Sequence, residues 1–165
     1  MDEQSTTPPT QSEIDEAILY AKKFLEDLLS FFGLNCDVYA TTEDNEVIEL
    51  HVPSTHMNGF LIGQHGDTMR SLQFMVASAL KNNDYALNRV NVDVADYKKT
   101  RADKLAKQAE NWIKKVRQTN EPYHLKPMNA ADRRIVHKVA GEAGLETYSE
   151  GEGRDRHVVL VPSAE

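Results

Sequence analysis

Residue types suited to contacting a phosphate backbone occur in a short glycine-bounded segment, Gly63-Gln64-His65-Gly66. Because glycine has no side chain, a nucleic-acid backbone can come within hydrogen-bond distance of the main-chain N–H groups at such a loop. A motif this short also occurs in plain turns between helices, so the four residues alone predict either a nucleic-acid contact or a simple connection. We expect aspartate at both glycines to weaken nucleic-acid binding while leaving the fold nearly native.

A second group of this kind combines Arg133 with His137 in a segment with helical spacing. Residues four apart lie about one turn apart on a helix, so one phosphate or base could contact both side chains on a solvent-facing flank. An Arg and a His at this spacing are more often only a solvated helix face. Arg134 is a neighbouring cation, and Arg154 and Arg156, two apart on a predicted strand, would share a face and extend the cationic surface.

The net charge of −7 and the isoelectric point near 5.4 argue at first against a nucleic-acid partner, because polyanions repel each other. The charge is unevenly distributed, however. Residues 1–55 carry two lysines and twelve acidic residues, whereas residues 96–120 carry eight basic and three acidic residues. A phosphate backbone responds to such a local concentration of positive charge, so the net charge does not exclude RNA binding.

The sequence gives little support for catalysis or for metal binding. The six histidines show no H-E-x-x-H or Cys/His pairing, no nucleophile–base motif occurs, and no Lys-Ser/Thr pair follows Gly66. We therefore expect no catalytic residues, no metal site, no cofactor and no enzymatic activity. The single Cys36 excludes an internal disulfide, no apolar run approaches about 20 residues, and the N-terminus lacks a secretory pattern, which together predict a cytoplasmic protein without a membrane span.

Hydrophobic spacing predicts the elements around the glycine-bounded segment. An amphipathic helix follows the predicted N-cap Ser12 and ends at Gly33, and two alternating segments then predict antiparallel strands. A short apolar turn precedes the loop, a helix follows it, and Val90 to Val94 form a half-buried strand. The helix after the loop is expected to bury Met69, Leu72, Phe74 and Ala79, together with either Met75 or Val76.

The second half of the chain predicts the elements that hold Arg133 and His137. A long helix runs from about 97 to 119, with an apolar stripe on one side and lysines and arginines on the others. Asn129 is expected to cap the next helix, with Asp132 at its third position, and residues 141–144 close it. A β-hairpin with a turn at 150–153 follows.

Residues 57–74 (MNGFLIGQHGDTMRSLQF) resemble the heart of a KH domain, and the predicted order of elements matches the type II arrangement. The resemblance implies that the G-x-x-G loop clamps about four nucleotides of RNA. KH loops usually hold Lys or Arg between the glycines, whereas this loop holds Gln64 and His65, so its phosphate contact is expected to be weak near neutral pH.

Residues 126–137 (KPMNAADRRIVH), followed by 147–156 (TYSEGEGRDR), closely resemble the R-three-H (Arg-x-x-x-His) domain. In this order the two domains resemble the bacterial Jag family, also called KhpB or EloR. The resemblance implies RNA binding, association with a small stand-alone KH protein (KhpA), and a role in cell elongation or division. Many members carry a further N-terminal Jag domain; only a short acidic tail precedes the first predicted helix here, so we expect this chain to lack that domain.

We therefore predict an α+β chain with a disordered tail at 1–12, a type II KH-like domain (αββααβ) at 13–96, and an R-three-H domain of helices on a small sheet at 97–165. The expected partner is single-stranded RNA, with single-stranded DNA left open. The residues assigned to RNA contact are Gly63, Gln64, His65, Gly66, Arg70, Arg133, Arg134, His137, Arg154 and Arg156.

An alternative function is a protein–protein adaptor, or a chaperone-like partner of a small KH protein, for which RNA binding is secondary. The acidic N-terminal block and the uncharged pair Gln64-His65 favour this alternative.

Overall fold

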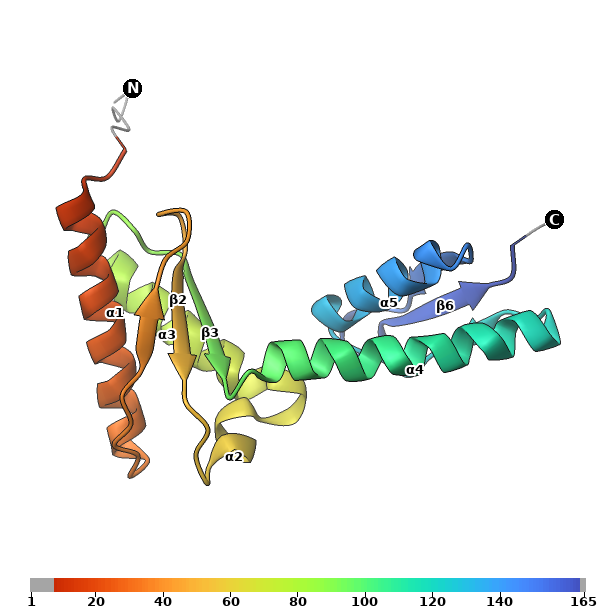
Figure 1. Ribbon diagram of the computed structural model, residues 1–165, viewed down its shortest axis with the longest axis horizontal. Coiled ribbons are helices and arrows are strands. Elements are labelled where there is room, and N and C mark those ends of the chain that lie inside the picture. The colour runs from red at the N-terminus through yellow and green to blue at the C-terminus, as the bar shows by residue number, and fades with distance from the viewer. Residues whose placement is uncertain (1–7, 164–165) are drawn as a thin grey trace. The chain divides into compact units, whose positions relative to one another are not determined.

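The computed structural model describes residues 8–163 and divides into two compact units, Met1–Tyr97 and Lys98–Glu165. Both units mix helices with a small sheet (Figure 1), which confirms the predicted α+β class. Each unit has its own hydrophobic core. Among residues 8–163, no helix combines the length and the apolar character that crossing a membrane requires.

The first helix, α1 (Gln11–Phe31), begins earlier than predicted because Thr10, not Ser12, is its N-cap. The Thr10 hydroxyl accepts a hydrogen bond from the Glu13 N–H at 3.4 Å, and the Glu13 carboxylate accepts one from the Thr10 N–H at 2.7 Å. This reciprocal capping box satisfies two main-chain donors. Residues 11 and 12 are therefore helical and not part of a tail, while residues 1–7 of the predicted tail lie outside the described residues.

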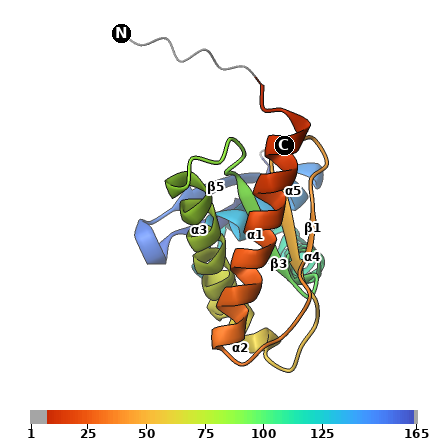
Figure 2. The same cartoon turned by 90° about the vertical axis from the view of Figure 1, so that its left-hand side faces the viewer.

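The first unit continues with β1 (Tyr39–Thr41), β2 (Ile48–Val52), α2 (Asn58–Ile62), the 3₁₀ turn η1 (Gln64–Gly66), α3 (Asp67–Asn82) and β3 (Val90–Val94). Strand β2 is central, antiparallel to β1 and parallel to β3, with Ile48 opposite Val90. Helices α1 and α3 lie side by side against one face of this sheet (Figure 2). The element order is the αββααβ order predicted from the sequence.

The inward face of α3 differs from the prediction. Met69, Leu72, Val76 and Leu80 are buried, whereas Phe74 is 72% exposed and Met75 also faces solvent. Residues two apart on a helix point about 200° from each other, so a helix that buries Leu72 necessarily exposes Phe74. The assignment of Phe74 to the core, and of Met75 as the alternative to Val76, was therefore wrong.

The second unit contains most of α4 (Tyr97–Thr119), then β4 (Tyr123–His124), α5 (Ala130–Glu142), β5 (Glu146–Glu150), the 3₁₀ turn η2 (Gly153–Asp155) and β6 (His157–Val161). Its sheet is antiparallel in the order β4-β6-β5, and α5 packs against β5 and β6. As predicted, Asn129 caps α5 by accepting a hydrogen bond from the Asp132 N–H at 2.9 Å. The two-residue strand β4 was not predicted.

Candidate nucleic-acid interface

The glycine-bounded segment forms the tight connection between α2 and α3. Gly63, His65 and Gly66 adopt positive φ angles of 71°, 53° and 85°. Histidine enters the left-handed region more readily than most residues, although less readily than glycine. The connection leads into the N-terminus of the sixteen-residue helix α3, where aligned peptide dipoles favour an anion.

The two glycines are required by the fold itself, which contradicts the expectation that aspartate would be tolerated at both. A Cβ atom at Gly63 would lie 2.8 Å from the main-chain nitrogen of Thr68 and would overlap the Thr68 hydroxyl oxygen. At Gly66, a Cβ atom would lie 3.3 Å from the Tyr97 ring. Replacing these glycines would therefore disturb the start of α3, and lost RNA binding would not separate a contact from a folding defect.

Substitutions at the two residues between the glycines test an RNA contact more directly, because the Gln64 and His65 side chains are exposed. Arg70 lies on the first turns of α3, where its Nη1 donates a hydrogen bond to the His65 carbonyl oxygen at 3.1 Å. Its guanidinium also pairs with the Asp67 carboxylate. Arg70 thus holds the loop and brings a cation beside it, although the adjacent Asp67 offsets part of that charge.

Arg133 and His137 share a flank of α5, as predicted, but that flank does not simply face solvent. The Arg133 guanidinium donates a hydrogen bond through Nη1 to the Met128 carbonyl oxygen at 3.0 Å. The His137 ring is half-buried against β5, where Nδ1 lies 2.8 Å from the Thr147 hydroxyl and Nε2 lies 3.0 Å from the Ser149 hydroxyl. His137 therefore joins α5 to the sheet through both ring nitrogens, and its replacement is expected to lower stability.

The surroundings of His137 disfavour its charged form. Burial lowers the pKa of the His137 imidazole below its usual value of 6.5, and the positive charge of Arg133 lowers this pKa further. The imidazole is therefore neutral at physiological pH. Any contact that it makes with RNA is then a hydrogen bond or a stacking contact, not an ion pair with phosphate.

Acidification is expected to destabilise the protein through His137. Because the folded-state pKa lies below that of the unfolded chain, the unfolded chain binds this proton first as the pH falls. The stabilisation is complete above pH 6.5 and is lost as the pH falls through the lowered pKa. Denaturant unfolding at about pH 7.5 and about pH 5 should show a smaller pH effect in His137→Gln than in the wild type. A control, His56→Gln at an exposed histidine, should behave like the wild type; an unchanged pH effect in His137→Gln would contradict the prediction.

The remaining predicted cations, Arg134, Arg154 and Arg156, are all exposed. Arg154 and Arg156 do not share a strand face as predicted, because Arg154 lies in η2 and Arg156 lies between η2 and β6. Because residues 153–155 form this tight turn, β6 begins at His157 and includes neither arginine. The Met128 N–H donates a hydrogen bond to the Arg156 carbonyl oxygen at 3.1 Å, so the segment before α5 lies next to the main chain at Arg156. The carbonyl oxygen of the same Met128 accepts the hydrogen bond from Arg133.

Helix α4 supplies the largest group of basic residues, and three of them have roles inside the second unit. Arg101 forms a salt bridge with the buried Asp132 at 2.9 Å, Lys115 lies 4.3 Å above the Tyr123 ring, and Arg117 donates to the Ala143 carbonyl oxygen. The sequence predicted Asp132 only as a residue of the first turn of α5. Its salt bridge with Arg101 joins residues thirty-one positions apart, so no local sequence pattern could predict it. All six lysines of the helix are exposed: Lys98, Lys99, Lys104, Lys107, Lys114 and Lys115.

Comparison with known proteins supports the interpretation of the second unit. Residues 103–162 match the R-three-H domain family. The chain is 33% identical over 144 residues to the RNA-binding protein KhpB of Clostridium symbiosum, an alignment that covers 85% of this chain and 64% of that protein. It is 28% identical over 148 residues to KhpB of Bacillus subtilis, covering 88% of this chain and 70% of that protein. For KhpB of Lactiplantibacillus plantarum the identity is 29%, and the chain spans about half of that protein, 51%.

Proposed function

We infer that this chain, which is homologous to the Jag-family protein KhpB over most of its length and carries an R-three-H domain, binds single-stranded RNA. The observation that carries this proposal is the exposed pair Gln64-His65, presented between two glycines at the N-terminus of α3 in a unit with the αββααβ order. Main-chain N–H groups and the helix dipole at such a site attract a phosphate, and Arg70 adds a cation beside it.

The second unit would extend the contact along the strand. Its exposed lysines on α4 provide charge for phosphates. Arg134, inside the Arg133–His137 segment of α5, and Arg154 and Arg156, before β6, are further exposed cations of this unit. In this proposal Arg133 and His137 act mainly by holding α5 in place, and their outer atoms contact RNA. Binding occurs without catalysis, and a regulatory role in cell elongation or division follows from the family resemblance alone.

The dependence of RNA affinity on salt tests the proposal. Each phosphate contact releases counterions, so log K against log salt should fall with a slope of about −0.7 per contact on a single strand. Lys104→Gln combined with Lys107→Gln should reduce the magnitude of the slope by up to about 1.4 if this face of α4 contacts the strand. Fluorescence anisotropy with labelled single-stranded RNA, measured at several salt concentrations, gives the slope directly.

A matched control removes the same charge from the first unit. Lys23→Gln combined with Lys81→Gln, both at exposed positions, should leave the slope close to that of the wild type. A steep slope that the α4 substitutions do not change would move the phosphate contacts to the glycine loop and to the arginines of the second unit. A wild-type slope near zero would contradict RNA binding.

One observation favours the adaptor function as a second candidate. Phe31 is 84% exposed and Phe74 is 72% exposed on the first unit, and exposed apolar side chains of this size are frequent at protein–protein contacts. In this alternative the first unit binds a small stand-alone KH protein and RNA binding is secondary. A slope near zero in the salt experiment, together with a stable complex with such a protein, would favour the adaptor.

A further inference from the structure

Three side chains that commonly bind metal ions meet on the sheet of the second unit, at a place that no motif in the sequence marks. Glu150 at the end of β5 lies directly opposite His157 at the start of β6, and His124 of β4 lies opposite Val159 of β6. Residues two apart on a strand share a face, and so do residues directly opposite each other. His124, Glu150 and His157 therefore lie on one face of the sheet, opposite the face that carries the core residues Val158 and Leu160.

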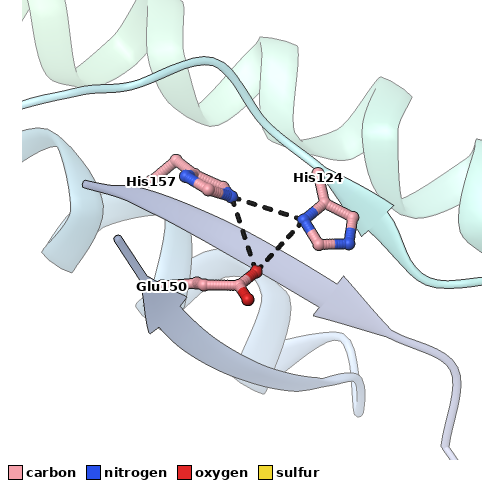
Figure 3. Close-up of side chains that lie close together, drawn as sticks. All are labelled: His124, Glu150 and His157. Atoms are coloured by element: carbon pink, nitrogen blue, oxygen red, sulfur yellow. Dashed lines mark hydrogen bonds and ion pairs between the residues drawn. The ribbon is translucent and has the colours of Figure 1, made fainter. Parts of the chain in front are cut away.

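The donor atoms of these side chains point toward one another (Figure 3). His124 Nδ1 lies 3.3 Å from His157 Nε2 and 3.3 Å from a Glu150 carboxylate oxygen, and His157 Nε2 lies 3.7 Å from the same oxygen. A tetrahedral Zn²⁺ with ligand bonds of about 2.0–2.2 Å places its donor atoms about 3.3–3.6 Å apart. The three atoms are therefore spaced as one triangular face of a zinc coordination sphere.

A hydrogen bond outside this triangle prepares His157 to act as a ligand. His157 Nδ1 lies 3.0 Å from the Asp155 carbonyl oxygen, which can only accept, so Nδ1 carries the proton and Nε2 presents its lone pair to the cluster. The η2 turn holds that carbonyl in place, because the Asp155 N–H itself donates to the Glu152 carbonyl oxygen at 3.0 Å. Metal-bound histidines usually have such a partner on the other ring nitrogen.

The charge of the cluster also suits a cation. The Glu150 carboxylate and the lone pair of His157 Nε2 both need a positive or hydrogen-donating partner, and within residues 8–163 the two groups face each other and the ring of His124. A divalent cation at this position would satisfy all three donor atoms at once. His124 and Glu150 are about half exposed and the His157 side chain is 21% exposed, so an ion can enter from solvent.

We propose that His124 Nδ1, His157 Nε2 and a carboxylate oxygen of Glu150 bind a Zn²⁺ ion. Two imidazole nitrogens and one carboxylate oxygen form a donor set that Zn²⁺ accepts, with a fourth coordination position left open to solvent. The bound ion would link β4, β6 and β5 across the whole width of the sheet. The proposal is independent of RNA binding, since none of the three ligands belongs to the residues assigned to RNA.

Calorimetric titration of the untagged full chain with Zn²⁺ tests the site. We expect one equivalent of Zn²⁺ per chain, and we expect His124→Ala, Glu150→Gln and His157→Ala each to weaken binding by at least about tenfold. Loading with Co²⁺ in place of Zn²⁺ should give the strong visible bands of a four-coordinate ion, which Glu150→Gln should abolish. Zn²⁺ should also raise the melting temperature of the wild type but not that of Glu150→Gln.

Two substitutions of the same chemistry elsewhere serve as controls. His56→Ala removes an exposed histidine of the first unit, and Glu152→Gln neutralises an exposed carboxylate two residues from Glu150. Both should bind Zn²⁺ with wild-type affinity. Absence of saturable Zn²⁺ binding in the wild type would overturn the proposal. It would equally be overturned by binding that survives all three ligand substitutions, or by binding that the control substitutions weaken to the same extent.

Discussion

Replacing Gln64 and His65 together with aspartate is expected to lower the affinity for single-stranded RNA by at least about tenfold, or about 1.4 kcal/mol. Both side chains are exposed, so the change adds two negative charges where a phosphate would approach the start of α3. The fold should survive, because aspartate is one of the residues that tolerate the left-handed conformation of His65, with its φ of 53°. Anisotropy with labelled RNA and circular dichroism together measure both effects.

The matched control places two aspartates at the other end of α3. Ala86→Asp combined with Asn88→Asp adds charge in the exposed connection between α3 and β3. The sixteen residues of α3, at about 1.5 Å of rise each, separate that connection from the glycine loop, so RNA affinity should change little. In the opposite direction, Gln64→Lys should strengthen binding by supplying the cation that the loop lacks. Equal affinity for the wild type and the Gln64/His65 double variant would remove the loop from the RNA contact.

Asp132→Ala is expected to lower the free energy of unfolding of the second unit by about 2–3 kcal/mol. The Asp132 side chain is only 5% exposed and lies 2.9 Å from Nη2 of Arg101, so its removal leaves the guanidinium beside an apolar core without its carboxylate. The expected loss is below the range of about 3–5 kcal/mol for fully buried pairs, because the Arg101 side chain is 30% exposed. Denaturant unfolding monitored by the fluorescence of Trp112, which packs against the same core, measures the change.

Asp103→Ala provides the control for this loss, since Asp103 is an exposed carboxylate on the same helix α4. It should change stability by no more than about 0.5 kcal/mol. The double substitution Arg101→Met with Asp132→Leu should recover much of the lost stability, because paired apolar replacements of a buried ion pair are often neutral. If Asp132→Ala were as stable as the wild type, the salt bridge between α4 and α5 would contribute nothing to the unit.

The amino-acid sequence by itself determined the order and most of the bounds of the helices and strands, because these depend on local patterns. The apolar residues of α1 recur at helical spacing up to Gly33, and Val90, Val92 and Val94 alternate with polar residues as a strand does. The strand is more buried than predicted, because Asp93 on its other face is also buried. Asn129 also caps α5 as its residue type predicts. The R-three-H interpretation, which depended on a long local motif, is confirmed by the match to the R-three-H domain family.

The phase of a helix against its sheet was decided by tertiary packing. Helical geometry prevents Leu72 and Phe74 from facing the same side, and the contacts of α3 with α1 and β3 decided that the side with Leu72 and Val76 is the buried one. In the same way, the His137 ring is half-buried because Thr147 and Ser149 of β5 lie against it, and this burial, together with the charge of Arg133, lowers the pKa of the imidazole. Local spacing contains no information about such neighbours, since they are distant in the chain.

The cluster of His124, Glu150 and His157 shows the same limit most clearly. Each residue looks ordinary in the sequence, and β4 is too short for an alternation pattern to predict it. Only the pairing of β4 and β5 on either side of β6 places three donor atoms within 4.8 Å of one another. Side chains from separate strands meet through the register of the sheet, and long-range hydrogen bonding and core packing determine that register.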